Sequence, residues 1–72
     1  MTFYGYSIVS GSTLTIHVGR DREDVEDSLY YSCDVDECSV IKFGTVEAEF
    51  AGRAAEKIAA NEWESCERRE ME

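Results

Sequence analysis

Two runs of apolar residues near the N-terminus follow the patterns of β-strands. Residues 3–9 are aromatic and β-branched, and residues 13–18 alternate between polar and apolar side chains. Ser10, Gly11 and Ser12 between them favour a turn, because glycine adopts positive φ without steric cost. The pattern therefore predicts a β-hairpin. The apolar face of its second strand consists of Leu14, Ile16 and Val18.

The segment that follows is rich in acidic residues and can enter a core only through Val25 and Leu29, which are four positions apart. Residues 21–27 are expected to form either one or two turns of exposed helix capped by Asp21, or a long charged loop. Residues 28–33 either continue this helix or form a third strand with every second side chain inward. We favour the strand.

The C-terminal half contains one further strand and a long helical pattern. Residues 39–43 contain the β-branched Val40 and Ile41 followed by Phe43, which predicts a short strand after a polar turn. Alanine and glutamate are frequent in residues 46–68 and Thr45 is a suitable N-cap, so this run predicts a long helix. An alternative splits the run, because residues 46–50 also alternate as a strand does. Two apolar rows mark the helix: Phe50, Ala54 and Ile58, with Ala51, Ala55 and Ala59 beside them.

Together these elements predict an α+β fold: an antiparallel sheet of three or four strands with one long C-terminal helix packed on one face. The row of alanines lets the helix backbone approach its packing partner closely. That partner is either the inner face of the sheet or the same helix of a second copy, which would make a homodimer. Because the chain has 72 residues and no visible linker or repeat, we expect residues 1–72 to form a single domain.

The composition is that of a globular cytosolic protein. Apolar residues make up 43% of the chain, which is too many for a disordered segment despite the high charge. The sequence does not open on a basic region followed by an apolar run, and no stretch is long and apolar enough to span a membrane. Three cysteines, an odd number, fit free thiols in a reducing cytosol better than a disulfide framework.

Negative charge is concentrated in two stretches of a chain whose net charge is −9. Residues 20–38 contain eight acidic residues and two arginines, giving −6, and residues 61–72 contain five and two, giving −3. These fields disfavour nucleic acid and anionic membranes as partners, because no stripe of Lys and Arg is present to hold phosphates. The charge predicts a basic protein surface as the partner. Alternatively, the acidic residues only keep a small protein soluble.

Residue types that could support catalysis or metal binding are present but are not arranged for it. His17 lies on the polar side of its strand, and no nucleophile or carboxylate is patterned beside it. The three cysteines and His17 are scattered along the chain, whereas a structural zinc site uses two pairs of closely spaced ligands. The acidic residues 34–37 resemble the start of a calcium-binding loop, but Ser39 stands where that loop requires glycine. No nucleotide-binding, metalloprotease or hydrolase motif occurs. We therefore predict a non-enzymatic protein with no cofactor and no metal.

Aromatic side chains exceed what so small a core can bury. Alternation places Tyr4 and Tyr6 opposite Phe3, so we expect exposed tyrosines on one side of that strand, unless the rings cover the second face of the sheet. Tyr30 and Tyr31 follow the first acidic stretch as candidate interface anchors. The predicted partner-binding residues are Asp21, Glu23, Asp24, Glu26, Asp27, Asp34, Asp36, Glu37, Tyr30 and Tyr31.

In length, charge and lack of a catalytic set, the chain resembles the small acidic inhibitors that bacteriophages encode, such as anti-CRISPR and other DNA-mimic proteins. The resemblance implies a stoichiometric inhibitor in the host cytosol that occupies a basic nucleic-acid-binding surface of a host defence complex. The alternative function is a small regulatory or structural module that pairs through its alanine-rich helix.

Overall fold

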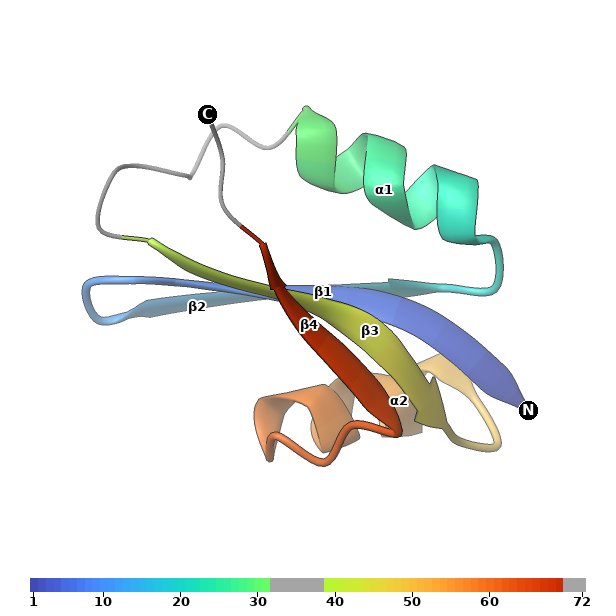
Figure 1. Cartoon of the computed structure of the whole chain (residues 1–72). Helices are drawn as coiled ribbons and strands as arrows, with labels where there is room; N and C mark the ends of the chain where they lie inside the picture. The colour runs from blue at the N-terminus through green and yellow to red at the C-terminus, as the bar shows by residue number, and fades with distance from the viewer. Residues whose placement is uncertain (32–38, 70–72) are drawn as a thin grey trace.

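A four-stranded antiparallel sheet with one helix on each face forms the framework of the computed structural model (Figure 1). The structure describes residues 1–31 and 39–69. The α+β class predicted from the sequence is confirmed. In chain order the elements are β1 (Thr2–Ser10), β2 (Thr13–Gly19), α1 (Arg22–Tyr30), β3 (Val40–Glu47), α2 (Ala51–Ala59) and β4 (Ser65–Arg69).

The sheet is built around two central strands, β1 and β3. Its order is β2-β1-β3-β4, and each neighbouring pair is antiparallel. The predicted hairpin is confirmed as β1 and β2, joined through Gly11 at φ 61°, a left-handed conformation that glycine adopts without strain. The strand predicted for residues 39–43 is also present, but it begins at Val40 and continues as the longer β3. Helices cover both faces of the central strands, so these strands contribute to two cores.

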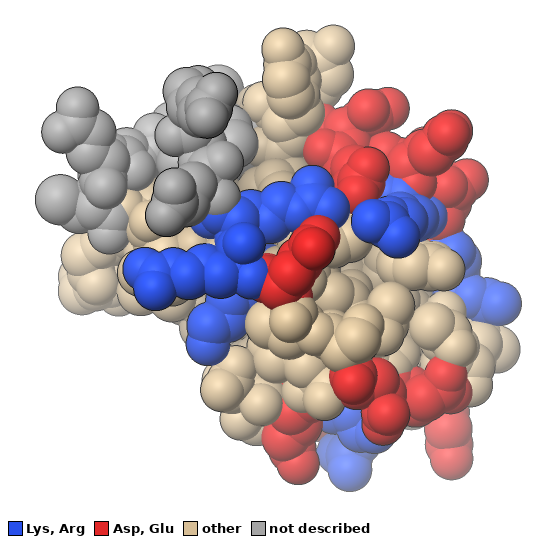
Figure 2. Space-filling model, viewed as in Figure 1, with Lys and Arg blue, Asp and Glu red and all other residues tan. Residues whose placement is uncertain are grey.

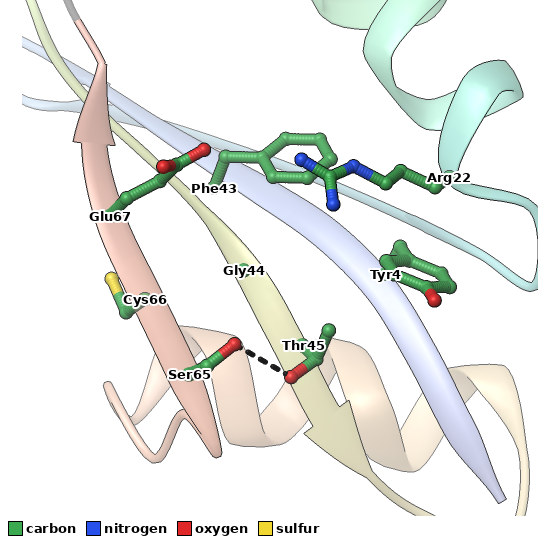
Figure 3. Close-up of a pocket in the computed structure, with 8 residues that line it drawn as sticks. All are labelled: Tyr4, Arg22, Phe43, Gly44, Thr45, Ser65, Cys66 and Glu67. Carbon is green, nitrogen blue, oxygen red and sulfur yellow. Dashed lines mark hydrogen bonds between the residues drawn. The ribbon is translucent and has the colours of Figure 1, made fainter.

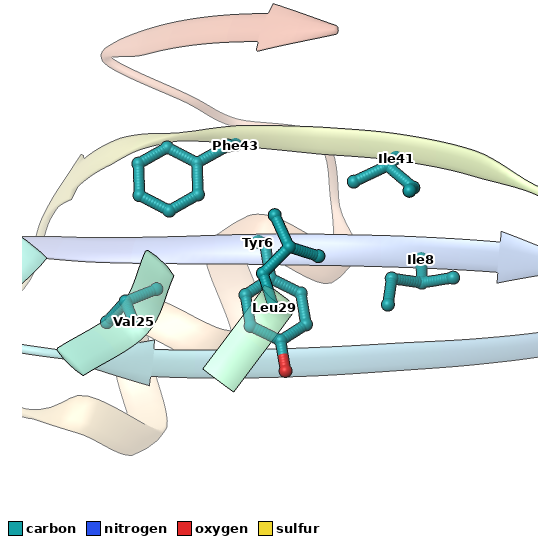
Figure 4. Packing of buried hydrophobic residues seen from close by; sticks show 6 residues of the cluster. All are labelled: Tyr6, Ile8, Val25, Leu29, Ile41 and Phe43. Carbon is teal, nitrogen blue, oxygen red and sulfur yellow. The ribbon is translucent and has the colours of Figure 1, made fainter. Parts of the chain in front are cut away.

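The first core lies between α1 and the sheet (Figure 4). Val25 and Leu29, four positions apart, form the inward stripe of α1, and both are buried. The Tyr6 hydroxyl forms a hydrogen bond with Ser28 Oγ of the helix at 3.1 Å, so the ring is buried without an unsatisfied polar end. The sheet contributes buried side chains from its two central strands: Tyr6, Ile8, Ile41 and Phe43.

The second core lies under α2, on the opposite face of the sheet. Ala54 and Ile58 are its helical members and are buried, whereas Phe50, Ala51 and Ala59 remain exposed. Ala54 belongs to the row of Phe50 and Ile58, and it is this row, not the predicted row of Ala51, Ala55 and Ala59, that packs α2 against the sheet. The sheet and its flanking segments contribute Phe3, Val46 and Ala48, with Ile16, Val18 and Trp63 partly buried against them.

Gly5 and Gly44 lie opposite each other in β1 and β3 and make room for neighbouring elements. A Cβ on Gly5 would lie 2.5 Å from the Ile58 side chain of α2. A Cβ on Gly44 would overlap the Ser65 carbonyl oxygen and lie 2.9 Å from Cys66 Cα, both in β4. Glycine at these positions therefore fixes how closely α2 and β4 approach the centre of the sheet.

The prediction of one long C-terminal helix over residues 46–68 is wrong. The first two residues of that run continue β3, and the N-cap of α2 is Phe50 rather than Thr45. Helix α2 ends after 9 residues, and residues 65–69 form a strand at the edge of the sheet. Two short helices on opposite faces thus replace the single helix on one face (Figure 1).

Asn61 explains why α2 stops. Its φ is 60°, in the left-handed region that asparagine tolerates better than most residues. The Asn61 N–H donates to the Ile58 carbonyl at 3.0 Å, and the Glu62 N–H donates to the Lys57 carbonyl at 2.8 Å. These paired bonds are those of a Schellman motif, which satisfies the last carbonyls of the helix. The chain then turns back, and β4 joins the sheet beside β3.

Substitution of Asn61 should separate the role of its backbone from that of its side chain. Its Oδ1 accepts hydrogen bonds from Lys42 and Trp63 at 3.1 Å, and both Asn61→Gly and Asn61→Ala would remove them. Alanine also strains the left-handed backbone, so we expect Asn61→Ala to be less stable than Asn61→Gly by about 1 kcal/mol. Urea denaturation measures the difference. Equal stabilities would contradict a conformational role for Asn61.

Two expectations about aromatic segments are also corrected. Residues 28–30 belong to α1 and not to a strand, so Leu29 faces the core while Tyr31 is 76% exposed; residues 32–33 lie outside the described residues. Tyr6 is 4% exposed and Tyr4 is half-buried, so of the two alternatives for these rings, coverage of the second face of the sheet is the one present. Residues 28–30 continue the helix because Leu29 extends the inward stripe that begins at Val25, and this helix covers the side of the sheet that carries Tyr4 and Tyr6.

Candidate protein-binding face on helix α1

Helix α1 begins where the sequence offers an N-cap. The Asp21 carboxylate accepts a hydrogen bond from the Glu23 N–H at 2.9 Å, which satisfies one free donor of the first turn. Glu23 and Asp24 in that turn lie near the positive end of the helix dipole. The acidic residues that discourage a core thus favour the start of a helix. Of the two alternatives for residues 21–27, the helix capped by Asp21 is the one present, and it extends to Tyr30.

The outward side of α1 carries three carboxylates followed by two tyrosines. Asp27 is two positions from both buried residues of the helix, and at 3.6 residues per turn it points directly away from the sheet. The other members fall three or four positions from it and share its side. We call this surface the acidic-tyrosine face, and it consists of Glu23, Asp24, Asp27, Tyr30 and Tyr31, all exposed.

The two tyrosines are more exposed than the other large hydrophobic side chains among the described residues. Tyr30 is 73% exposed and Tyr31 is 76% exposed. Their rings meet edge to face, with centroids 5.2 Å apart. This contact orders the pair relative to each other while leaving most of both rings open. Such rings lose little conformational freedom on binding, which makes them suitable interface anchors.

Glu26 is not part of this face, although the sequence grouped it with the other acids. Arg22 Nε lies 3.2 Å and Arg69 Nη2 2.9 Å from Glu26 Oε1. The Arg69 guanidinium also lies 4.5 Å from the centroid of the buried Phe43 ring. Hydrogen bonds from Arg69 and then Arg22 hold the pKa of Glu26 below its ordinary value. Glu26 therefore ties α1 to β4.

Arg69 is a structural residue that the sequence did not identify. It also pairs with Glu67 at 2.7 Å, so it bridges two carboxylates from different elements. Partial burial lowers the pKa of Arg69, but its hydrogen bonds to Glu67 and Glu26 raise that pKa overall. The sequence separation of 43 residues between Glu26 and Arg69 explains why no local pattern indicated the pair.

Acidic side chains gather in two regions of the visible surface, over α1 and beside α2. Several basic side chains lie between these regions, and others lie next to the acidic side chains themselves (Figure 2). Glu23, Asp24 and Asp27 form no ion pair with any residue that the structure describes. No described Lys or Arg therefore neutralises the outer carboxylates of α1.

The structure brings together most of the predicted partner-binding residues. Asp21, Glu23, Asp24, Asp27, Tyr30 and Tyr31 lie along one helix or at its ends, whereas Glu26 turns towards β4. The second predicted group, Asp34, Asp36 and Glu37, lies outside the described residues. His17 is exposed on its strand as predicted, with its ring centroid 5.5 Å from that of Tyr6.

A shallow cavity of about 290 Å³ lies between α1 and β4 (Figure 3). Its polar side chains are largely engaged within the molecule. Thr45 and Ser65 hydroxyls bond to each other at 3.0 Å, and Arg22 is held by Glu26. Within residues 1–31 and 39–69, no three His, Cys, Asp or Glu side chains are placed to hold a metal ion. The cavity is lined by Tyr4, Arg22, Phe43, Gly44, Thr45, Ser65, Cys66 and Glu67.

Comparison of the chain with protein-family models, with curated proteins and with solved structures found no match. Of the two helices in the described residues, neither has the length and apolar character needed to cross a membrane.

The ion pairs of Glu26 predict a specific dependence of stability on pH. Since the folded-state pKa of Glu26 lies below its ordinary value of 4.5, the pairs stabilise the fold above that pH. Their contribution is lost as the pH falls through the lower, folded-state pKa. We expect Glu26→Gln to lower the melting temperature at neutral pH, and we expect this difference to shrink at acidic pH.

Asp27→Asn is the matched control for this measurement. It removes one charge from the same helix but breaks no ion pair of the described residues. We expect it to leave the melting temperature unchanged or raised, because it relieves repulsion on an acidic surface. A gap between wild type and Glu26→Gln that stays constant from neutral to acidic pH would contradict the assigned role of Glu26.

Proposed function

We propose that this protein is a non-enzymatic binding protein of the cytosol whose acidic-tyrosine face occupies a basic surface of another protein. The supporting observation is the contrast within α1. Two arginines neutralise Glu26, whereas Glu23, Asp24 and Asp27 pair with no described residue. Unpaired carboxylates on one side of a helix create a local negative field that steers positively charged partners.

The tyrosine pair contributes affinity that the charges alone do not. Exposed charge pairs contribute little affinity, because they remain solvated and are screened by salt. Tyr30 and Tyr31 add two open aromatic surfaces at the end of the carboxylate row. Aromatic anchors contribute much of the affinity of protein interfaces, while charges set the approach and the register. The face thus combines steering with a contact that can become buried.

A basic surface shaped to hold nucleic acid is the partner that this chemistry fits best. Such a surface presents Lys and Arg side chains spaced to contact a row of phosphates, and the outer carboxylates of α1 also form a row. Occupation of that surface would block nucleic acid stoichiometrically, as the resemblance to phage-encoded anti-CRISPR and DNA-mimic inhibitors of host defence complexes implies. Pairing through the alanine-rich helix stays a prediction from the sequence.

Competition with nucleic acid tests this function. The protein is immobilised, incubated with a cell lysate, washed, and then exposed to duplex DNA or to RNA. We expect the retained partner to be released by nucleic acid and to bind nucleic acid itself when it is isolated, because both ligands need the same Lys and Arg side chains. Retention that neither DNA nor RNA reverses would contradict the proposal.

A further inference from the structure

Strand β2 is an edge of the sheet that carries no charged residue. Its seven residues, Thr13–Gly19, include no Asp, Glu, Lys, Arg or Pro, in a chain whose net charge is −9. Its register with β1 runs without a bulge from Tyr4↔Gly19 to Ser10↔Thr13. No strand among the described residues pairs with its outer side, and in Figure 4 it is the last strand of the sheet.

The other edge is built differently. Strand β4 has only five residues, and three of them are Glu67, Arg68 and Arg69. Short length and charged side chains are the usual means by which an edge strand avoids pairing with another chain. Strand β2 has neither protection. Its outer backbone N–H and C=O groups are therefore open to a further strand.

The pattern of polar and apolar side chains along β2 is symmetric about Ile16. Apolar Leu14 and Val18 lie two positions away on either side, and polar Thr15 and His17 lie one position away. An antiparallel copy of the same strand, centred on Ile16, would place Leu14 opposite Val18 of the second copy. It would also continue the apolar row on the α2 face without interruption.

An exposed apolar patch borders the same edge. Leu14 is 49% exposed, and its cross-strand neighbour Val9 is 43% exposed. Both side chains, with Val40 and Ile58, line an open hollow on the α2 face. Because the net charge of −9 makes two copies repel each other, an edge without charged side chains is a surface on which they can meet with little local repulsion.

We propose that β2 pairs with β2 of a second copy, in antiparallel register about Ile16, and that the protein forms a dimer through one continuous eight-stranded sheet. The two-fold axis is perpendicular to the sheet, so both α1 helices lie on the same side. The dimer therefore presents two acidic-tyrosine faces in one direction. This interface is distinct from the alanine row of α2.

Sedimentation at increasing protein concentration tests the dimer. The variant Leu14→Glu places a charge on the edge, and Val9→Glu places the same charge on the same face one strand further in. We expect a dimer for wild type, and about tenfold weaker dimerisation for Leu14→Glu than for Val9→Glu. The reason is that the two-fold axis places position 14 of both copies in the paired strands, whereas position 9 lies one strand away in each copy. Melting temperatures confirm that both variants fold.

Disulfide trapping tests the register. In a chain with Cys33, Cys38 and Cys66 replaced by serine, Ile16→Cys places two cysteines directly opposite each other across the axis. Their Cα separation of about 5 Å is within disulfide range. His17→Cys is the control, because position 17 faces position 15 of the second copy. We expect oxidation to join Ile16→Cys chains and not His17→Cys chains.

Ionic strength separates this dimer from binding of a basic partner. Two copies of charge −9 repel each other, so added salt should strengthen dimerisation. A monomer at all concentrations, at low and at high salt, would overturn the proposal. So would a dimer that Leu14→Glu and Val9→Glu weaken equally and that Ile16→Cys does not trap.

Discussion

Replacement of Gly44 by alanine is expected to destabilise the protein by about 3 kcal/mol and to loosen β4 from the sheet. The added Cβ would overlap the Ser65 carbonyl oxygen and lie 2.9 Å from Cys66 Cα. Both neighbours are backbone atoms, which cannot move aside as the end of a flexible side chain can. The strand must therefore shift, and the contacts of Arg69 with Glu26 and with Phe43 would shift with it.

Gly52→Ala is the matched control for this substitution, because it makes the same chemical change in an exposed turn of α2. Its Cβ would lie 3.4 Å from the Phe50 ring, which is an ordinary contact. Alanine is a better helix former than glycine, so we expect a gain of about 1 kcal/mol. Urea denaturation measures both changes. A Gly44→Ala protein as stable as wild type would show that β4 does not approach the sheet as described.

Neutralisation of the outer carboxylates of α1 is expected to have the largest effect on binding. The triple variant Glu23→Gln, Asp24→Asn and Asp27→Asn removes three charges without breaking an ion pair of the described residues. We expect the affinity for the basic partner to fall about 10-fold, equivalent to about 1.4 kcal/mol, because each exposed charge pair contributes about 0.5 kcal/mol. Titration calorimetry with the isolated partner gives this value.

The control must remove the same charge elsewhere on the molecule. Glu49→Gln, Glu62→Gln and Glu64→Gln also remove three exposed carboxylates and give the same net charge. We expect this variant to bind within a few-fold of wild type, because distant exposed charges are screened. If both variants lose affinity equally, net charge rather than the face on α1 determines binding.

The parts of the fold that the sequence predicted correctly depend on local patterns. The alternation around Leu14 and Ile16, with Gly11 in the turn, is contained within the hairpin that it predicts. Asp21 likewise caps the helix that begins beside it. In each case the residues that carry the signal are close in sequence to the contacts they make, so no knowledge of the rest of the fold was needed.

The prediction of a long helix is wrong because helix-forming composition alone does not show where a helix ends. Asn61 is the preferred residue after glycine for a left-handed helix end, and this signal was available in the sequence. The strand character of β4 was not available. Residues 65–69 contain no alternating apolar pattern, and they form a strand because Gly44 admits them beside β3. Tertiary context therefore decided their conformation.

In the candidate site, too, some features follow from local sequence and others from tertiary contacts. Helical spacing from the buried residues Val25 and Leu29 would have placed Asp27 and its neighbours outward once a helix was assumed. A strand over residues 28–33 would place Tyr30 and Tyr31 on opposite faces, whereas the helix places both on its outward side with Asp27. The pairing of Glu26 with Arg69 joins residues 43 positions apart, and only the packing of α1 near β4 brings them together.

The salt dependence of the affinity for the isolated basic partner tests the central claim most directly. The binding constant is measured over a series of salt concentrations for wild type, for the triple variant of α1 and for its charge-matched control. We predict a steep loss of affinity with salt for wild type and the control, and a clearly shallower loss for the triple variant. The same slope for all three proteins would contradict the claim that the carboxylates of α1 face the partner.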